Sequence, residues 1–389
     1  MLILKTAFKN IIGGGKKTWL NVFVLSFTMV LMIALIALID GWLEESRTET
    51  INWETGGGQL WHPAYDRYDI FTLQDAHGDI PNAAKKCISE GQATPLLIMQ
   101  GTIYPDGRMQ SVLLKGIDPE QSVIEIPAAS LADKSSDYIP AVIGRRMARS
   151  ADICEGDVVM LRWRDANGVF DAREIIVAGI FDTKATGVDG GQIWVDLGDL
   201  YDMTGMHGEA TMIIKSGECA LNEGSGGWIY HGLDYLLADL DAMAAAAWVE
   251  VVIIFALLMA LCLLAVYDTQ TLSIFRRQKE IGTYIALGMT PRRVIGLFTL
   301  EGTTYSLLAV ATGLVWGTPL LWLFGKYGFS MPGSFEDMMG TDTLYPVYNF
   351  SSIFGSLAIV ILLSALISYL PARKIARQNV VYALKGKIQ

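Results

Sequence analysis

The chain has 389 residues, of which 52% are hydrophobic and only 18% are charged, and its formal net charge is −10. This composition is too apolar for an ordinary soluble protein and too charged for a chain that lies wholly in a membrane. It predicts membrane helices combined with a soluble domain, and the acidity of that domain argues against nucleic acid as a partner.

The charges are unevenly distributed along the chain. Residues 43–243 hold 15 Lys+Arg against 32 Asp+Glu, whereas the N-terminal tail, residues 271–293 and the C-terminal tail together hold 14 basic residues and one acid. Because basic segments stay on the cytoplasmic side of a membrane, this asymmetry predicts cytoplasmic termini, a cytoplasmic 271–293 loop and an acidic domain outside.

The chain begins with an amphipathic segment over residues 2–12, which we expect to lie as a short helix in the inner membrane interface. The GGGKKT run that follows is no phosphate-binding loop, because Asn10 and Lys17 stand where that motif needs a glycine and a Ser or Thr. The chain therefore has no ATPase motif of its own.

Four apolar stretches are long enough to cross a bilayer, at Trp19–Ile39, Ala244–Val266, Ile295–Phe324 and Ile353–Leu370. The first is too long for a typical signal peptide and no cleavage site follows it, so we expect a retained anchor. The expected organisation is a cytoplasmic amphipathic helix (1–18), spans at 19–42, 244–268, 294–325 and 351–371, a periplasmic α+β domain (43–243), a cytoplasmic loop (269–293), a periplasmic loop (326–350) and a cytoplasmic tail (372–389).

The soluble domain carries short elements of both kinds, which favours α+β over a sandwich or a doubly wound sheet. Strand patterns occur at Gly58–Trp61, Pro95–Gln100, Ser111–Ile117, Val158–Arg164, Ile175–Phe181 and Ile193–Val195. Helical patterns occur at Asn82–Glu90, Ala141–Asp152 and Leu197–Met203, and Asn222–Gly227 is typical of a flexible return to the membrane.

The cysteines allow little cross-linking. Cys87, Cys154 and Cys219 fall in the soluble domain, where at most one disulfide can form and one thiol is left over, so we expect no disulfide framework. Neither these cysteines nor the four histidines have the spacing of a metal site, and no catalytic constellation stands out.

The loop between the second and third spans has more order than an orientation signal needs. Ile281 and Ile285 lie at i,i+4 with Tyr284 beside them, which predicts an exposed helix with an apolar side for docking in a partner's groove. Gly288 is placed to stop that helix, and Thr290 with Pro291 to start the next. Glu301, at the inner end of the third span, is expected to pair with Arg276 or Arg277.

The segment RRQKEIGTYIALGMTPRRVIGLFTLEG (Arg276–Gly302) resembles the motif between spans two and three of type VII ABC transporter permeases, the MacB/FtsX/LolC–LolE superfamily. Other segments are similar to the LolE-like branch: TAFKNI (Thr6–Ile11), TGGGQLWHPAY (Thr55–Tyr65), LLKGIDPE (Leu113–Glu120), VIGRRMARSADICEGDVVML (Val142–Leu161) and LPARKIARQNVVYALKGK (Leu370–Lys387). The chain departs from that branch at Gly57 and Trp61, where the family has histidines, and at Asn379-Val380, where it has Asp-Pro.

The resemblance implies a mechanotransmission permease in the inner membrane of a Gram-negative bacterium. It would pair with a second permease, identical or related, and bind a separate ATPase dimer that holds the ATP and Mg²⁺; the chain itself would need no cofactor. The residues implied to contact the ATPase are Arg276, Arg277, Lys279, Glu280, Ile281, Tyr284, Ile285, Leu287, Arg292 and Arg293.

The implied cargo is a lipoprotein or another amphiphile, released toward an acceptor outside. A lipid-handling dimer is expected to expose an apolar cavity between the first two spans, lined by Phe23, Phe27, Met29, Met32, Phe255 and Met259. For any single one of these residues, ordinary lipid contact or helix packing is an equally good interpretation. Two alternatives stay open at this point: peptide or drug efflux with an adaptor protein, as in MacB-like permeases, and regulation of a cell-wall hydrolase, as in FtsX-like ones.

Overall fold

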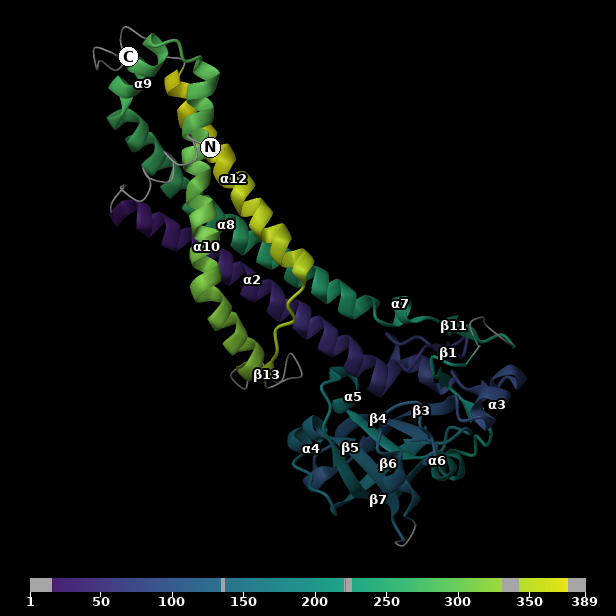
Figure 1. Ribbon diagram of the computed structural model, residues 1–389. Coiled ribbons are helices and arrows are strands. Elements are labelled where there is room, and N and C mark those ends of the chain that lie inside the picture. Colours follow the sequence, from purple (N-terminus) through teal and green to yellow (C-terminus); the bar gives the residue numbers. More distant parts are fainter. Residues whose placement is uncertain (1–15, 134–136, 220, 222–225, 331–342, 377–389) are drawn as a thin grey trace. The chain divides into compact units, whose positions relative to one another are not determined.

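The computed structural model describes residues 16–133, 137–219, 221, 226–330 and 343–376 (Figure 1). The chain divides into two compact units. Unit 1 comprises Met1–Trp42, Met243–Ser330 and Thr343–Gln389, and unit 2 comprises Leu43–Ala242 and Met331–Asp342. The predicted helix at residues 2–12 and the end of the tail lie outside the described residues.

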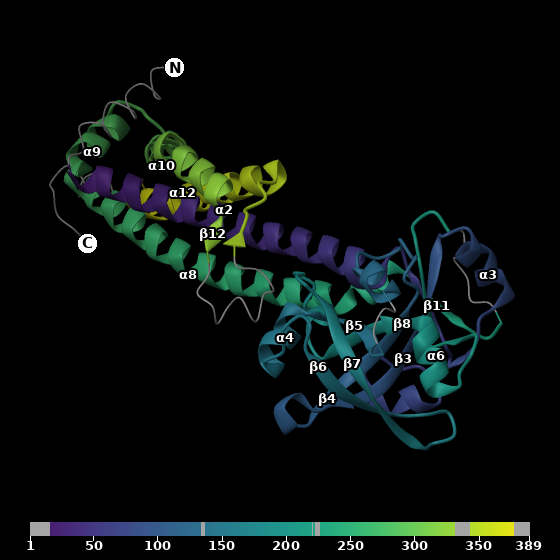
Figure 2. The same cartoon turned by 90° about the horizontal axis from the view of Figure 1, so that it is seen from below.

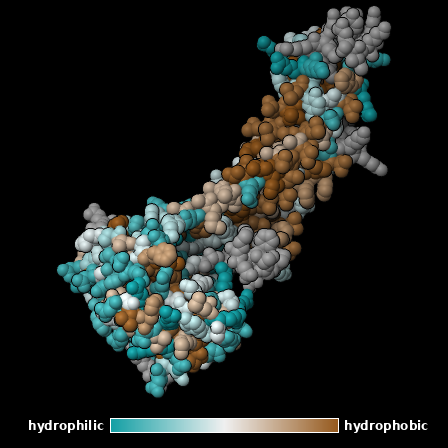
Figure 3. Space-filling view, turned by 180° about the vertical axis from the view of Figure 1, so that it is seen from behind, coloured by the Kyte–Doolittle hydropathy of each residue, from teal (hydrophilic) through white to brown (hydrophobic). Residues whose placement is uncertain are grey.

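Unit 1 is built from long apolar helices. Four helices of the described chain are long and apolar enough to cross a membrane: α2 (Lys16–Thr50), α8 (Ala238–Arg276), α10 (Pro291–Tyr327) and α12 (Phe350–Ala376). Half of the apolar window of α2 is buried, against about a fifth in the others. Their outward surface is hydrophobic (Figure 3), as lipid contact requires. The predicted four-span membrane protein is confirmed.

Small and hydroxyl side chains hold these helices together. The Asn21 Nδ2 donates to Thr269 Oγ1 of α8 at 2.6 Å, and the Thr28 hydroxyl lies 3.1 Å from Cys262 Sγ. Gly302 of α10 faces Ser368 of α12 so closely that an added Cβ would lie 2.1 Å from Ser368 Oγ. Close approach at small residues is how helices associate where the hydrophobic effect gives no help.

Unit 2 is a mixed α+β domain inserted between the first two membrane helices, as predicted. Its main sheet runs in the order β11-β1-β10-β3-β4-β8-β5-β7-β6, and β6 pairs back onto β3, so the last six strands close into a barrel (Figure 2). The strands are β1 (Gln59–Trp61), β3 (Ala93–Ile103), β4 (Gln110–Ile117), β5 (Ile139–Gly144), β6 (Val158–Arg164), β7 (Phe170–Phe181), β8 (Gln192–Asp196), β10 (Met212–Lys215) and β11 (Ile229–His231).

Alternation along the strands produces two cores, one on each face of the barrel wall. On β4, Val112 and Leu114 face the barrel interior, where they pack with residues such as Trp163. Leu113 and Ile117 face outward and pack with Trp194 and with the segments that cover this side. The side-chain period of two on a strand explains how one wall serves both cores.

Short helices cover the barrel and its outer wall. The remaining elements are α3 (Asn82–Ser89), α4 (Arg145–Ala151), α5 (Thr186–Asp189), α6 (Leu197–Thr204), α7 (Leu233–Leu236), η1 (Ile51–Thr55), η2 (Ile70–Gln74), η3 (Pro105–Gly107), η4 (Ala128–Ala132) and the short strand pairs β2–β9 (Gly78–Asp79, Glu209–Ala210) and β12–β13 (Phe329–Ser330, Thr343–Leu344). The π-helix η1 continues α2 and ends at Gly56, whose φ of 56° and close approach to Ile214 exclude a side chain there.

One predicted element is wrong in part. The helix expected over Ala141–Asp152 is helical only in α4, and its first residues belong to β5. All six residues of β5 are buried, because both faces of the strand are covered: Ala141 and Ile143 pack in the barrel interior and Val142 packs in the outer core. A strand buried on both faces loses the polar alternation that would have distinguished it from a helix.

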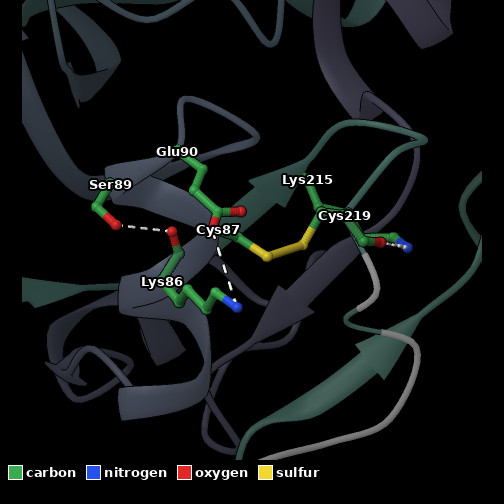
Figure 4. Close-up of a disulfide and its surroundings, with 6 residues drawn as sticks. All are labelled: Lys86, Cys87, Ser89, Glu90, Lys215 and Cys219. Carbon is green, nitrogen blue, oxygen red and sulfur yellow. Dashed lines mark hydrogen bonds and ion pairs between the residues drawn. A yellow bond between two sulfur atoms is a disulfide. The ribbon is translucent and has the colours of Figure 1, made fainter.

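Unit 2 contains a disulfide between Cys87 of α3 and Cys219 (Figure 4), which leaves Cys154 as an exposed free thiol. The pairing respects the predicted limit of one disulfide. The two cysteines are 132 residues apart in the sequence, so the bond closes most of the domain into a loop.

We expect Cys87→Ser to lower the free energy of unfolding of unit 2 by about 2–5 kcal/mol, because the cross-link restricts the unfolded chain. Urea-dependent proteolysis of the full chain in nanodiscs measures this change. Cys154→Ser is the matched control and should stay within about 0.5 kcal/mol of wild type; equal losses in both variants would contradict the structural role of the bond.

Candidate functional site

The candidate site is the helical turn that joins α8 to α10. It contains α9 (Gln278–Ala286), which ends as the sequence predicted: Gly288 has a φ of 94°, its N–H donates to Ile285 O at 3.0 Å, and the Met289 N–H donates to Tyr284 O at 3.0 Å. This pair of bonds is the Schellman motif. Thr290 then precedes α10, with Pro291 as its first residue.

The apolar side of α9 faces the chain itself. Ile281 is only 2% exposed and packs with Ile274, Phe298 and Ala372, and Ile285 is partly buried against the same cluster. The interpretation of Ile281 as part of an exposed docking face is therefore wrong. The i,i+4 pattern was correctly identified, but the groove that it fills is formed by α8, α10 and α12 of the same chain.

Arg277 fixes α9 to α10 through two carboxylates. Its Nη1 lies 3.0 Å from Glu301 Oε2, its Nε lies 2.8 Å from Glu280 Oε2, and its guanidinium carbon lies 5.3 Å from the centroid of the Phe298 ring. The side chain of Glu301 is 6% exposed and that of Arg277 is 21% exposed. The predicted pairing of Glu301 is thus confirmed with Arg277, not Arg276, as the partner.

The other residues of the turn point away from the protein. Leu287 is 80% exposed, and exposed basic side chains lie on both sides of it. We call this set the α9 surface: Arg276, Lys279, Glu280, Leu287, Arg292 and Arg293. Tyr284 is half-buried beside it. A large exposed leucine within a basic surround suits docking to a protein partner better than it suits solvent.

A buried polar residue behind this turn escaped the sequence reasoning. Gln270 of α8 is 1% exposed, and among the described residues neither its side-chain oxygen nor its side-chain nitrogen has a hydrogen-bond partner. It lies against Gly302, at the close contact of α10 with α12. The available signal was its spacing just beyond the predicted second span: Gln270 lies four residues after Val266 and four before Ile274, on one helical face, and both of these neighbours are buried.

The six residues expected to line a cavity have different environments in the described chain. Met29 and Met259 are each 2% exposed and belong to the packed core of the helices, which corrects their assignment. Met32 and Phe255 border a hollow of only about 10 Å³ between α2 and α8. Phe23 and Phe27 are exposed and stack on Trp316, with ring centroids 6.1 and 6.2 Å apart.

In unit 2, the outer ends of α2 and α8 are joined to each other and to the barrel. Arg47 Nη2 lies 3.2 Å from Asp241 Oδ2, linking the two helices. Glu45 pairs with the Lys184 ammonium, and Glu49 accepts from the backbone N–H of the same lysine at 3.3 Å. The segment between β7 and α5 thus holds α2 at two successive turns.

Residues 252–380 match a family model, the FtsX-like permease C-terminal domain. Over this part of its length the chain is similar to FtsX-like permeases. The match spans most of α8 and all of α9, α10 and α12, so it includes the α9 surface and the Arg277–Glu301 pair, whereas the barrel of unit 2 lies outside it. No curated protein matches the chain. Among the described residues, no group of three or more His, Cys, Asp or Glu is placed to hold a metal ion.

The FtsX-like permease domain is typically the non-catalytic component of a transporter, and four candidate spans make this chain a multi-pass membrane protein. What the site can do chemically agrees with that class. Its residues offer charge, an exposed leucine and a short helix held by packing and an ion pair, which suit the binding of a partner.

Proposed function

We propose that this chain is the permease subunit of a mechanotransmission ABC transporter, and that the α9 surface binds a separate ATPase dimer. One observation carries this proposal: the exposed Leu287 with its basic surround lies within the matched FtsX-like permease domain. ATP and Mg²⁺ would be held by the ATPase. The role of this chain would be to receive the movement of the ATPase on α9, which the Arg277–Glu301 pair fixes to α10.

The route outward follows α2 and α8. Each helix runs unbroken through the boundary between the units, at residues 42/43 and 242/243. Their outer ends are fixed to unit 2 by the Glu45, Glu49 and Arg47 contacts. A continuous helix is a stiff element, so a displacement of its inner end would be passed to the barrel.

Two features support an arrangement with unit 2 outside the cell and the α9 surface in the cytoplasm. The acidic and basic segments are separated as the positive-inside rule requires. The Cys87–Cys219 disulfide belongs in an oxidising compartment such as the periplasm. We therefore place the chain in the inner membrane of a Gram-negative bacterium, paired with a second permease.

The cargo that we propose is an amphiphile of the outer leaflet, with lipoproteins as the leading class, passed to a periplasmic acceptor. The support is the resemblance to LolE-like segments described above. The hollow between α2 and α8 at Met32 and Phe255 has only about 10 Å³, so we propose that lipid-sized cargo is received at the surface that carries Phe23 and Phe27, where a second permease could complete a pocket.

Affinity purification of the full chain in mild detergent, with mass spectrometry of the co-eluting proteins, tests the ATPase partner. Leu287→Asp should reduce the recovered P-loop ATPase about 30-fold, the effect of losing an interface hot spot. Met109→Asp, an equally exposed residue of unit 2, is the matched control and should leave recovery unchanged. Ile281 is unsuitable, because its substitution by Asp would disrupt the packing of α9.

Recovery of the same amount of ATPase from wild type and from Leu287→Asp, or of none from either, would overturn the proposal. The remaining co-eluting proteins identify the cargo. Lipoproteins support the release function, an efflux adaptor would replace it with MacB-like export, and a cell-wall hydrolase would replace it with FtsX-like regulation.

A further inference from the structure

A lysine lies buried on the outward face of the barrel wall. Lys115 is the middle residue of the outward row Leu113, Lys115, Ile117 on β4, and it is 7% exposed. Its Nζ lies 4.8 Å from the centroid of the Trp194 ring on the neighbouring strand β8. No hydrogen bond or ion pair of Lys115 occurs among the described residues. The Glu54 carboxylate lines the same cavity and acts on Lys115 only at longer range, without an ion pair among the described residues. A buried ammonium without an ion-pair partner is costly, so the structure around Lys115 has to offset this cost.

Lys115 borders a cavity of about 300 Å³ that lies wholly within unit 2. The lining residues come mainly from the adjacent sheet strands β1, β10, β3, β4 and β8, and from η1, η2, α5, α7 and residues 65–67. Just over half of the lining is apolar or aromatic, including Trp61, Ile98, Trp194 and Met212, and the lining also contains four charged residues, Glu54, Asp66, Arg67 and Lys115. A hollow that combines apolar walls with polar groups is the usual form of a ligand site.

Two further polar atoms of the lining residues have no hydrogen-bond partner in the part of the chain that the structure describes. They are the indole N–H of Trp194 and the side-chain oxygen of Gln192, both buried. The lysine and the indole can only donate hydrogen bonds, so two of the three groups require an acceptor. The Gln192 oxygen accepts a hydrogen bond, so it could bind a hydroxyl group of the ligand or a water molecule that lies beside the ligand's acceptor group.

We propose that this cavity binds a small amphiphilic anion. Its carboxylate or phosphate head accepts from Lys115, and its apolar body lies against Trp61, Ile98 and Met212. A cavity at the small end of the range for ligand sites admits one short chain or an aromatic ring, and it excludes a two-chain lipid. The site goes beyond the proposed transport function and does not depend on it, because every lining residue belongs to unit 2.

The binding partner can be tested with three photoreactive probes that share one eight-carbon, diazirine-bearing tail and differ in the head: carboxylate, phosphate monoester or alcohol. The full chain in nanodiscs is illuminated with each probe, and labelled peptides are mapped. We expect labelling of peptides that contain Trp61, Ile98 or Met212 by one or both anions, and at least about tenfold less by the alcohol. The stronger anion identifies the head group.

Lys115→Met should reduce the anionic labelling of these peptides at least about tenfold, and Lys115→Arg should retain part of it. Lys85→Met, at an exposed lysine of α3, is the matched control and should label as wild type. Protection of the Cys87–Cys219 disulfide from reduction reports that each variant is folded. Equal labelling by the alcohol and the anions in wild type would overturn the proposal whatever the variants do, as would unchanged labelling of folded Lys115→Met.

Discussion

Arg277→Leu is expected to loosen α9 from the membrane helices by about 3 kcal/mol, which raises local opening about 150-fold. The reason is the carboxylate that it leaves behind. The Glu301 side chain is 6% exposed and Arg277 is the basic residue that contacts it, at 3.0 Å. Removing one member of a buried ion pair costs more than the pair contributes, because the other charge stays buried without a partner.

Hydrogen exchange of residues 278–298 in the full chain, followed by mass spectrometry, measures this loosening. Arg276→Leu is the matched control: its side chain is exposed, and exchange should stay close to wild type. The double variant Arg277→Leu with Glu301→Leu should recover most of the protection, because no charge remains buried. Faster exchange that persists in the double variant would assign the effect to lost packing on Phe298 and would contradict the ion-pair explanation.

The same variants separate stability from coupling in the proposed transporter. Arg277 lies behind the α9 surface, whereas Leu287 lies on it. Leu287→Asp should therefore lose the ATPase without faster exchange in α9, and Arg277→Leu should lose both together. This contrast distinguishes a residue that positions the helix from one that contacts the partner.

Lys115→Met is expected to stabilise unit 2 at pH 7 by about 3 kcal/mol. Burial lowers the pKa of Lys115 from 10.5 to about 8, and the negative charge of Glu54 offsets only part of this. The unfolded chain therefore binds a proton more readily than the folded chain between pH 8 and 10.5. Below pH 8 the lysine is charged in both states, so folding pays the full free-energy cost of burying the charge. This cost decreases as the pH rises from 8 toward 10.5, because the folded protein then holds a neutral lysine.

Urea-dependent proteolysis of the nanodisc-embedded chain at pH 7 and at pH 9.5 checks this prediction. The stability difference between Lys115→Met and wild type should shrink at the higher pH, whereas Lys85→Met should follow wild type at both. A constant difference would show that the lysine is not buried as a charge. A bound anion would hold the proton on Lys115 and flatten the wild-type curve, so the carboxylate and phosphate probes should be compared with buffer alone.

The membrane architecture followed from local features of the sequence. Apolar length set the four spans, and the local pattern Gly288, Thr290, Pro291 set where α9 ends and α10 begins, because helix termini are decided by a few neighbouring residues. The pairing of Glu301 with a basic residue could also be predicted, since a carboxylate at the end of a span is stabilised by a nearby base. The strands with clear alternation, such as β6, were found for the same local reason.

Tertiary packing decided the rest. The sequence showed that Ile281 lies on an apolar face, but only the packing of α8, α10 and α12 shows that this face is buried within the chain. The sequence showed that Lys115 lies between Leu113 and Ile117. It did not show that β4 belongs to a closed barrel, or that η1 and η2 help to line a cavity over Lys115. The physical reason is the range of the interactions: caps, spans and turns depend on residues a few positions apart, whereas a barrel's closure, the pairing of Cys87 with Cys219 and the environment of Lys115 depend on segments a hundred residues apart.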